Sequence, residues 1–160
     1  MQTEMAVIFT DAEIDKLIKE QKQLLPDWRK HLSLRPRRGH EEFKADFNGE
    51  SGNEFRLILR HNSINPLDFS VILAVRVPQT NRLFRLRRYN GKSHEHTNSL
   101  EKETFYDFHI HTATERYQKS ENKKEDKYAE VTTRYGDFSG ALDCLIEDAG
   151  FPSEPQLSLL

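Results

Sequence analysis

The stretch that decides the fold is LDFSVILAVRV, residues 67–77, which contains the longest alternating run of apolar side chains in the chain. Apolar residues occupy every second position from Leu67 to Val77. Successive side chains of a β-strand point to opposite faces, so a period of two predicts a strand with one face toward the core. We expect this segment to be the central strand of a sheet.

Shorter alternating runs on both sides of residues 67–77 predict neighbouring strands. Asn48-Gly49 is a dipeptide typical of hairpin turns, and further turns are expected at 62–66 and 78–81. Consecutive strands joined by short turns are typical of an antiparallel meander. The strands are expected at residues 43–47, 55–60, 67–77, 82–89, 105–117 and 128–134. Residues 35–40 and 90–104 are expected to be loops.

Two helices are expected, one at each end of the sheet. Thr10 and Glu13 form a capping-box pattern, which predicts a helix over about 11–25 that ends before Pro26. A second helix is expected over about 138–149, because Gly150 and Pro152 are typical of a helix end. The prediction is therefore an α+β fold in a single domain, residues 1–160. It consists of an antiparallel meander of about 5–6 strands over about 42–134, flanked by an N-terminal and a C-terminal helix.

Composition limits the classes of function. The chain has 160 residues, 36% hydrophobic and 31% charged, with a net charge of −2, so no overall positive charge attracts nucleic acid. Cys144 is the only cysteine, which excludes a disulfide within the chain. The N-terminus lacks the pattern of a secretory signal, and no stretch approaches the ~20 apolar residues of a membrane helix. We expect a cytoplasmic protein without a membrane partner. The charge run KSENKKEDK, residues 119–127, predicts a solvated loop.

Histidines are concentrated in one part of the sequence. Four of the seven lie between His94 and His111. His94 and His96 belong to a polar loop, whereas His109 and His111 belong to a predicted strand. The period of two places His109 and His111 on one strand face together with Asp107 and Glu115. It places Phe108, Ile110 and Thr112 on the other, buried face.

Two chemistries use histidines at this spacing. Imidazoles bind zinc or iron when a further ligand completes the site, and an imidazole near pKa 6.5 can transfer protons as acid or base. The preceding strand bears on the choice. Its alternation places Arg85, Arg87 and Tyr89 on one face, and pairing with residues 105–117 would bring them beside the histidines. Guanidinium groups repel a metal ion but bind phosphate in a bidentate manner.

A histidine pair surrounded by cations favours a metal-independent endoribonuclease. In such a site, a base deprotonates the 2′-hydroxyl, an acid protonates the leaving oxygen, and cations neutralise the phosphate. No cofactor is then needed. The expected catalytic residues are His94, His96, His109, His111, Arg88 and Tyr89. The expected substrate-binding residues are Arg85, Arg87 and Lys92.

Two alternatives remain open. The first is a site for a divalent metal such as Zn²⁺, with ligands drawn from His94, His96, His109, His111 and Asp107. The second is a non-enzymatic interaction or inhibitor protein of a mobile element, whose sheet face binds another macromolecule. A homodimer is compatible with each of these hypotheses.

The segment RYNGKSHEHTN, residues 88–98, followed by FHIH, residues 108–111, resembles an uncharacterised bacterial family that shares an RYNG, HxH and HIH pattern. More distantly, this block resembles the TumE-type toxins of toxin–antitoxin modules. The resemblance implies an RNA-cleaving site, with RNA as substrate and an antitoxin protein as partner. It would place Arg88, His94, His96, His109 and His111 in that site.

Overall fold

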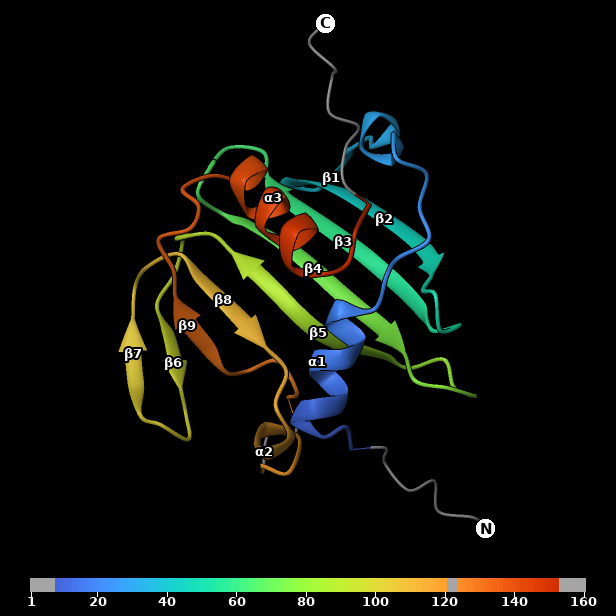
Figure 1. Cartoon of the computed structure of the whole chain (residues 1–160). Helices are drawn as coiled ribbons and strands as arrows, with labels where there is room; N and C mark the ends of the chain where they lie inside the picture. Colours follow the sequence, from blue (N-terminus) through green and yellow to red (C-terminus); the bar gives the residue numbers. More distant parts are fainter. Residues whose placement is uncertain (1–7, 121–123, 153–160) are drawn as a thin grey trace, which may run out of the picture.

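A computed structural model of the protein describes residues 8–120 and 124–152. Its architecture is α+β, with a seven-stranded antiparallel sheet in the order β1-β2-β3-β4-β5-β8-β9 and a separate two-stranded sheet, β6-β7. Helices α1 and α3 lie across one face of the large sheet (Figure 1). No helix in the described residues is long and apolar enough to cross a membrane.

The elements follow the chain in a simple order. The strands are β1 Arg35–Arg37, β2 His40–Asn48, β3 Glu54–Asn62, β4 Phe69–Arg76, β5 Leu83–Asn90, β6 His96–Asn98, β7 Glu103–Phe105, β8 His109–Thr112 and β9 Ala129–Val131. The helices are α1 Asp11–Lys19, the 3-10 turn η1 Trp28–His31, α2 Glu115–Gln118 and α3 Phe138–Asp148.

The central strand is β4, as the alternating run predicts. It lies between β3 and β5, and its core-facing residues Val71 and Leu73 are 0% exposed. These side chains pack in one hydrophobic core with Ile14 and Ile18 of α1 and Leu145 of α3. Strands β2 to β5 form the expected meander, which β8 and β9 extend on the far side of β5.

The helix ends agree with the capping signals, except at the end of α1. Both reciprocal hydrogen bonds of the Thr10–Glu13 capping box are present, and Gly150 has φ +66° just after α3. However, α1 ends at Lys19 rather than near residue 25. Glu20 turns to φ −54° and ψ 132°, and the next amides bond other segments: Lys22 N–H donates to Gly150 O and Gln23 N–H donates to Asn48 O. These tertiary bonds replace the helical ones.

The large sheet has more strands than predicted, and some segments differ from their expected structure. β1 lies in a predicted loop, and all three of its residues are exposed, so no apolar alternation marks it. β6 and β7 include residues of the predicted loop 90–104. The predicted strand 105–117 contains β8, but α2 then begins at Glu115, where the Thr114 side chain caps it.

A β-bulge in β5 changes which residues share a face. Leu73 of β4 pairs with Arg87, whereas the next residue, Ala74, pairs with Arg85. Leu86 is therefore an extra residue, and the alternation of β5 shifts by one position after it. Arg87 and Tyr89 consequently lie on the helix side of the sheet. The prediction that Arg85, Arg87 and Tyr89 share one face is wrong, because a bulge leaves no period-two signal in the sequence.

Gly91 is expected to be intolerant of a side chain. A Cβ atom at this position would lie 1.9 Å from the carbonyl oxygen of Leu67, a backbone atom that cannot move aside as the end of a flexible side chain can. We expect Gly91→Ala to lower the free energy of unfolding by about 1–3 kcal/mol, as overpacking does. A matched control is Gly136→Ala, where no atom lies within 4 Å of the added Cβ. Urea unfolding of both variants measures the difference, and equal stabilities would contradict the close approach.

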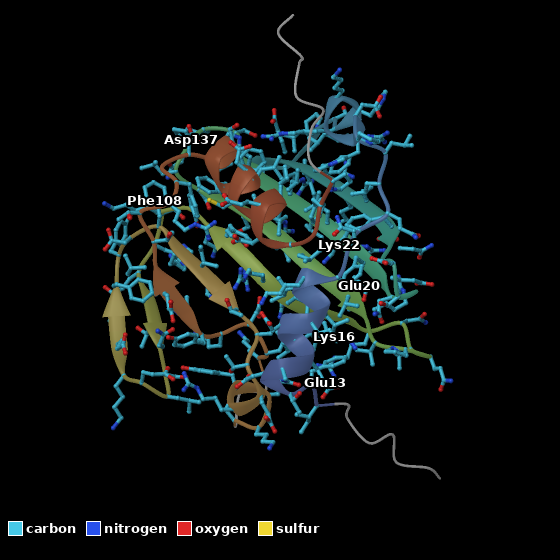
Figure 2. The ribbon with its side chains drawn as sticks, viewed as in Figure 1. Glu13, Lys16, Glu20, Lys22, Phe108 and Asp137 are labelled. Atoms are coloured by element: carbon cyan, nitrogen blue, oxygen red, sulfur yellow. The ribbon has the colours of Figure 1, made fainter. Side chains whose placement is uncertain are left out.

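Because Lys22 is buried, we expect the free energy of unfolding to rise with pH. Figure 2 shows this residue just beyond the end of α1, where it is 2% exposed and its ammonium group donates to Leu17 O and Ile18 O. Burial lowers the pKa of Lys22 from 10.5 to about 7, against the opposing charge of Glu20. Above pH 7 the unfolded chain therefore binds a proton that the folded chain has released, so the free energy of unfolding increases with pH. We expect wild type to gain stability relative to Lys22→Met between pH 7 and about pH 9 in urea titrations. Parallel pH profiles would show that Lys22 stays protonated.

Candidate functional site

Three of the four predicted histidines meet on the sheet face opposite the helices. His109 and His111 of β8 point to this side, while the intervening Ile110 lies opposite Tyr89 and points toward the helices. His96 of β6 packs over both: its ring centroid is 5.2 Å from His109 and 4.8 Å from His111. The His109 and His111 rings are 4.9 Å apart. We call His96, His109 and His111 the histidine trio, and all three are buried.

Asn98 holds the β6–β7 hairpin, and with it His96, in place. Asn98 is 0% exposed, and its side chain makes two hydrogen bonds to the backbone of β9. Its amide donates to Ala129 O at 2.8 Å, and its carbonyl accepts from Ala129 N–H at 2.9 Å. The same carbonyl oxygen lies 2.8 Å from His96 Nε2. Phe105, opposite His96 in the hairpin, packs 5.5 Å from the His109 ring and covers the trio.

Hydrogen bonds set which ring nitrogen carries the proton in two of the three imidazoles. His109 Nδ1 lies 2.7 Å from the backbone carbonyl of Asp107, so it carries the proton, and the lone pair of Nε2 faces the Asn90 side-chain amide at 3.5 Å. His96 Nε2 donates to Asn98, so Nδ1 carries the lone pair. His111 Nδ1 is buried and has no hydrogen-bond partner among the described residues. One ligand nitrogen from each ring lies within 4.8 Å of the other two.

Burial keeps the trio neutral. It lowers the pKa of His96, and it lowers the pKa of His109 to about 4 and that of His111 to about 2. The nearby charge of Arg88 acts in the same direction on His109 and His111. At neutral pH the three rings are therefore unprotonated, which is the form that ligates metal ions.

Arg88 is the charged neighbour of the trio, and a buried carboxylate balances it. Arg88 lies directly opposite His111 in the β5–β8 pair. Its Nη2 is 2.7 Å from Asp126 Oδ2, and Asp126 is 1% exposed. Arg85 approaches the same carboxylate at 3.5 Å. Asp126 thus offsets part of the positive charge next to the trio.

A pocket of about 390 Å³ opens beside the trio. His96 and His111 form part of its wall, and His94 also lines it. The remaining lining residues are Ser70, Arg85, Arg88, Asn90, Lys124, Asp126 and Lys127. The pocket therefore connects the buried imidazoles to a charged surface.

The other predicted site residues have different positions. His94 is exposed, with its ring 6.0 Å from His109. Tyr89 lies on the helix side, where its hydroxyl donates to Asp148 at 2.7 Å and burial raises its pKa. Arg87 binds the same carboxylate at 3.3 Å. Tyr89 and Arg87 are therefore separated from the trio by the sheet.

The acidic residues and Lys92 also differ from the expected arrangement. The Asp107 side chain is exposed and lies 3.9 Å from Lys92 Nζ, so Asp107 contributes to the trio only through its backbone. Glu115 begins α2 and pairs with Lys119. The prediction that Asp107 and Glu115 share the histidine face of one strand is wrong, because β8 spans only His109–Thr112. The split of β8 into a histidine face and an Ile110 face is confirmed.

The residues that support the trio carry no signal in the sequence that marks them as buried. Asn98 stands in the RYNGKSHEHTN segment, yet a lone polar residue in a predicted loop gave no signal of burial. Asp126, at 1% exposure, and Glu125, at 6%, contradict the expected solvated loop 119–127 at those positions. Their burial arises from the arginines of β5, which are distant in sequence. Residues 121–123 of that run lie outside the described residues.

The comparisons with known proteins identify a family. A model described as a family of unknown function, DUF6978, matches residues 9–143, so the chain belongs to that family. The matched residues include the trio, Arg88, Asn98 and Asp126. This agrees with the expected membership of an uncharacterised family. No curated protein and no solved structure matches the chain.

Asn98 is expected to stabilise the β6–β7 hairpin more than the adjacent Thr97 does. Asn98→Ala removes two bonds to Ala129 and the acceptor of His96, which leaves buried polar groups without partners. We expect the free energy of unfolding to fall by about 1–3 kcal/mol. Thr97→Ala is the control, because Thr97 is exposed and its side chain bonds only the Thr104 hydroxyl among the described residues. It should change stability by less than about 0.5 kcal/mol. Denaturant titration of both variants checks this, and similar losses would argue against the anchoring role.

Proposed function

We propose that this protein binds a divalent transition-metal ion of the zinc class through His96, His109 and His111. The observation that supports this most directly is the approach of three buried ring nitrogens, within 4.8 Å of one another, from two separate sheets. Three imidazoles are a common ligand set for zinc that acts on a substrate, because the fourth position stays open for water or substrate.

The geometry requires only a small adjustment to fit such an ion. Zn–N bonds of about 2.0–2.1 Å in a tetrahedral site separate the ligand nitrogens by roughly 3.3 Å. The trio must therefore close by about an ångström or somewhat more, which ring rotations can supply. The hydrogen bonds of His109 to Asp107 O and of His96 to Asn98 orient each ligand through its second nitrogen, as is usual around bound metals.

Two features of the trio lower the cost of binding a cation beside the basic residues of the pocket. The unpartnered Nδ1 of buried His111 would cost about 1–3 kcal/mol if it stayed unsatisfied, and a metal bond would remove that penalty. Asp126 offsets the charge of Arg88, so Arg88 opposes metal binding less than an isolated guanidinium would.

A second candidate function is RNA cleavage without a metal, as the resemblance to TumE-type toxins implies, with an antitoxin protein as partner. Arg85, Arg88 and His94 line the pocket beside the trio, which supports phosphate binding there. That mechanism needs one protonated and one neutral imidazole near neutral pH. Burial lowers the pKa of both His109 and His111, so neither is suited to be the protonated acid. We therefore prefer the metal site.

Metal analysis tests the first proposal. We expect protein purified without a polyhistidine tag to contain, or to take up after EDTA treatment, about one equivalent of Zn²⁺ or Co²⁺. His111→Ala should lower the affinity by roughly a hundredfold or more, since it removes a direct ligand. His31→Ala is the matched control, because His31 is exposed and contacts Asp27 rather than the trio.

The outcomes separate the two candidates. Elemental analysis and the visible absorption of Co²⁺ measure binding, and circular dichroism shows that each variant is folded. Uptake below about a tenth of an equivalent by folded wild type would refute the metal site. RNA cleavage by the same preparation in EDTA, lost in His109→Ala, would instead support the ribonuclease.

A further inference from the structure

We propose that the pocket beside the histidine trio binds the phosphate group of a phosphate ester, with one phosphate oxygen directed at the open position of the metal. This inference rests on the proposed function for the metal–oxygen bond alone. The cationic part of the pocket is independent of the metal.

The charge of the pocket supports an anionic ligand with more than one negative charge. Arg85 and Arg88 come from β5, and Lys124 and Lys127 come from the segment before β9, so two distant parts of the chain place four cations around one opening. Among the described lining residues Asp126 is the only acidic one, and Glu125 outside the lining also lies 3.9 Å from Arg85, so the cations of the pocket outnumber the carboxylates near them. The whole chain has a net charge of −2, so this concentration is local. A cleft lined by one sign of charge concentrates ligands of the opposite sign.

The two arginines of the pocket differ in their acidic neighbours. Arg85 lies 3.5 Å from Asp126 and 3.9 Å from Glu125. The Nη2 of Arg88 contacts Asp126, but its Nε is buried and has no hydrogen-bond partner among the described residues. Lys124 and Lys127 form no ion pair within the part of the chain that the structure describes. Unused donors on a fixed guanidinium and two further ammonium groups match the several oxygens of a phosphate group.

The position of the pocket links this anion site to the metal site. His96 and His111 belong both to the pocket wall and to the trio. His111 lies directly opposite Arg88 in the β5–β8 pair, so a phosphate that contacts Arg88 would lie next to the ligand nitrogens. Ser70 and Asn90, which bond each other at 2.8 Å, complete a polar wall. The volume of about 390 Å³ is within the range of small-molecule sites.

Two binding measurements on the full chain test the proposal. The first is calorimetric titration of metal-free and Zn²⁺-loaded protein with inorganic phosphate, a mononucleotide and a short single-stranded RNA. The second is the change in visible absorption when inorganic phosphate is added to Co²⁺-loaded protein. We expect phosphate binding to both forms, tighter with metal, and a spectral change in the Co²⁺ protein. Tighter binding of RNA than of the mononucleotide would identify a nucleic-acid backbone as the source of the phosphate, and equal binding would identify a small ester.

The matched variants are Lys124→Gln with Lys127→Gln in one chain, and Lys16→Gln as control. Lys124 is exposed and Lys127 half-buried, so their replacement should preserve the fold, and Lys16 is exposed on α1, on the other side of the sheet. We expect the double variant to bind phosphate roughly tenfold more weakly while it retains the Co²⁺ spectrum, and Lys16→Gln to behave as wild type. Co²⁺ uptake without phosphate binding, or with binding equal in all three proteins, would overturn this inference and leave the metal site standing. Failure to take up Co²⁺ would refute the metal site, and loss of phosphate binding to the metal-free double variant would still support the cationic pocket.

Discussion

The β-bulge at Leu86 is the constraint on which the candidate site depends. Without the extra residue, the alternation that buries Phe84 and Leu86 would place Arg88 on the helix side and Arg87 beside the histidines. With it, Tyr89 and Arg87 bind Asp148 under α3, and Arg88 faces His111. One local irregularity in hydrogen bonding therefore assigns each polar residue of β5 to its partner. The same strand stabilises the packing of α3 and shapes the pocket.

Much of the fold could be predicted from the sequence, because long strands and capped helices carry strong local signals. Residues 67–77 predict β4 through their period of two, and Thr10 and Gly150 predict helix ends through specific capping chemistry. The short elements could not be predicted in the same way. β1 is an exposed edge, and each strand of the β6–β7 hairpin has only three residues, so tertiary contacts rather than composition determine them.

The site was predicted in part. The spacing of His109 and His111 predicts that they share a strand face, since alternation needs no knowledge of the rest of the chain. The third member could not be distinguished: His94 and His96 have similar polar neighbours, and only the docking of Asn98 on β9 selects His96. Asp126 lies in a segment of charged residues, and its burial depends on Arg88, which is 38 residues earlier. Partnerships over such distances leave no local pattern.

The mode of attachment of the β6–β7 hairpin has a consequence for ligand affinity. A pair of three-residue strands has little stability of its own, so its docked population depends on Asn98 and on the rings that pack beneath it. Any ligand that needs His96 binds only the docked conformers, and its apparent affinity is reduced by the fraction of molecules that are undocked. Conversely, an ion held by both sheets would shift that population toward the docked state. The fraction of molecules with a docked hairpin would then rise with the occupancy of the site, because the ion would act as a reversible cross-link between the two sheets.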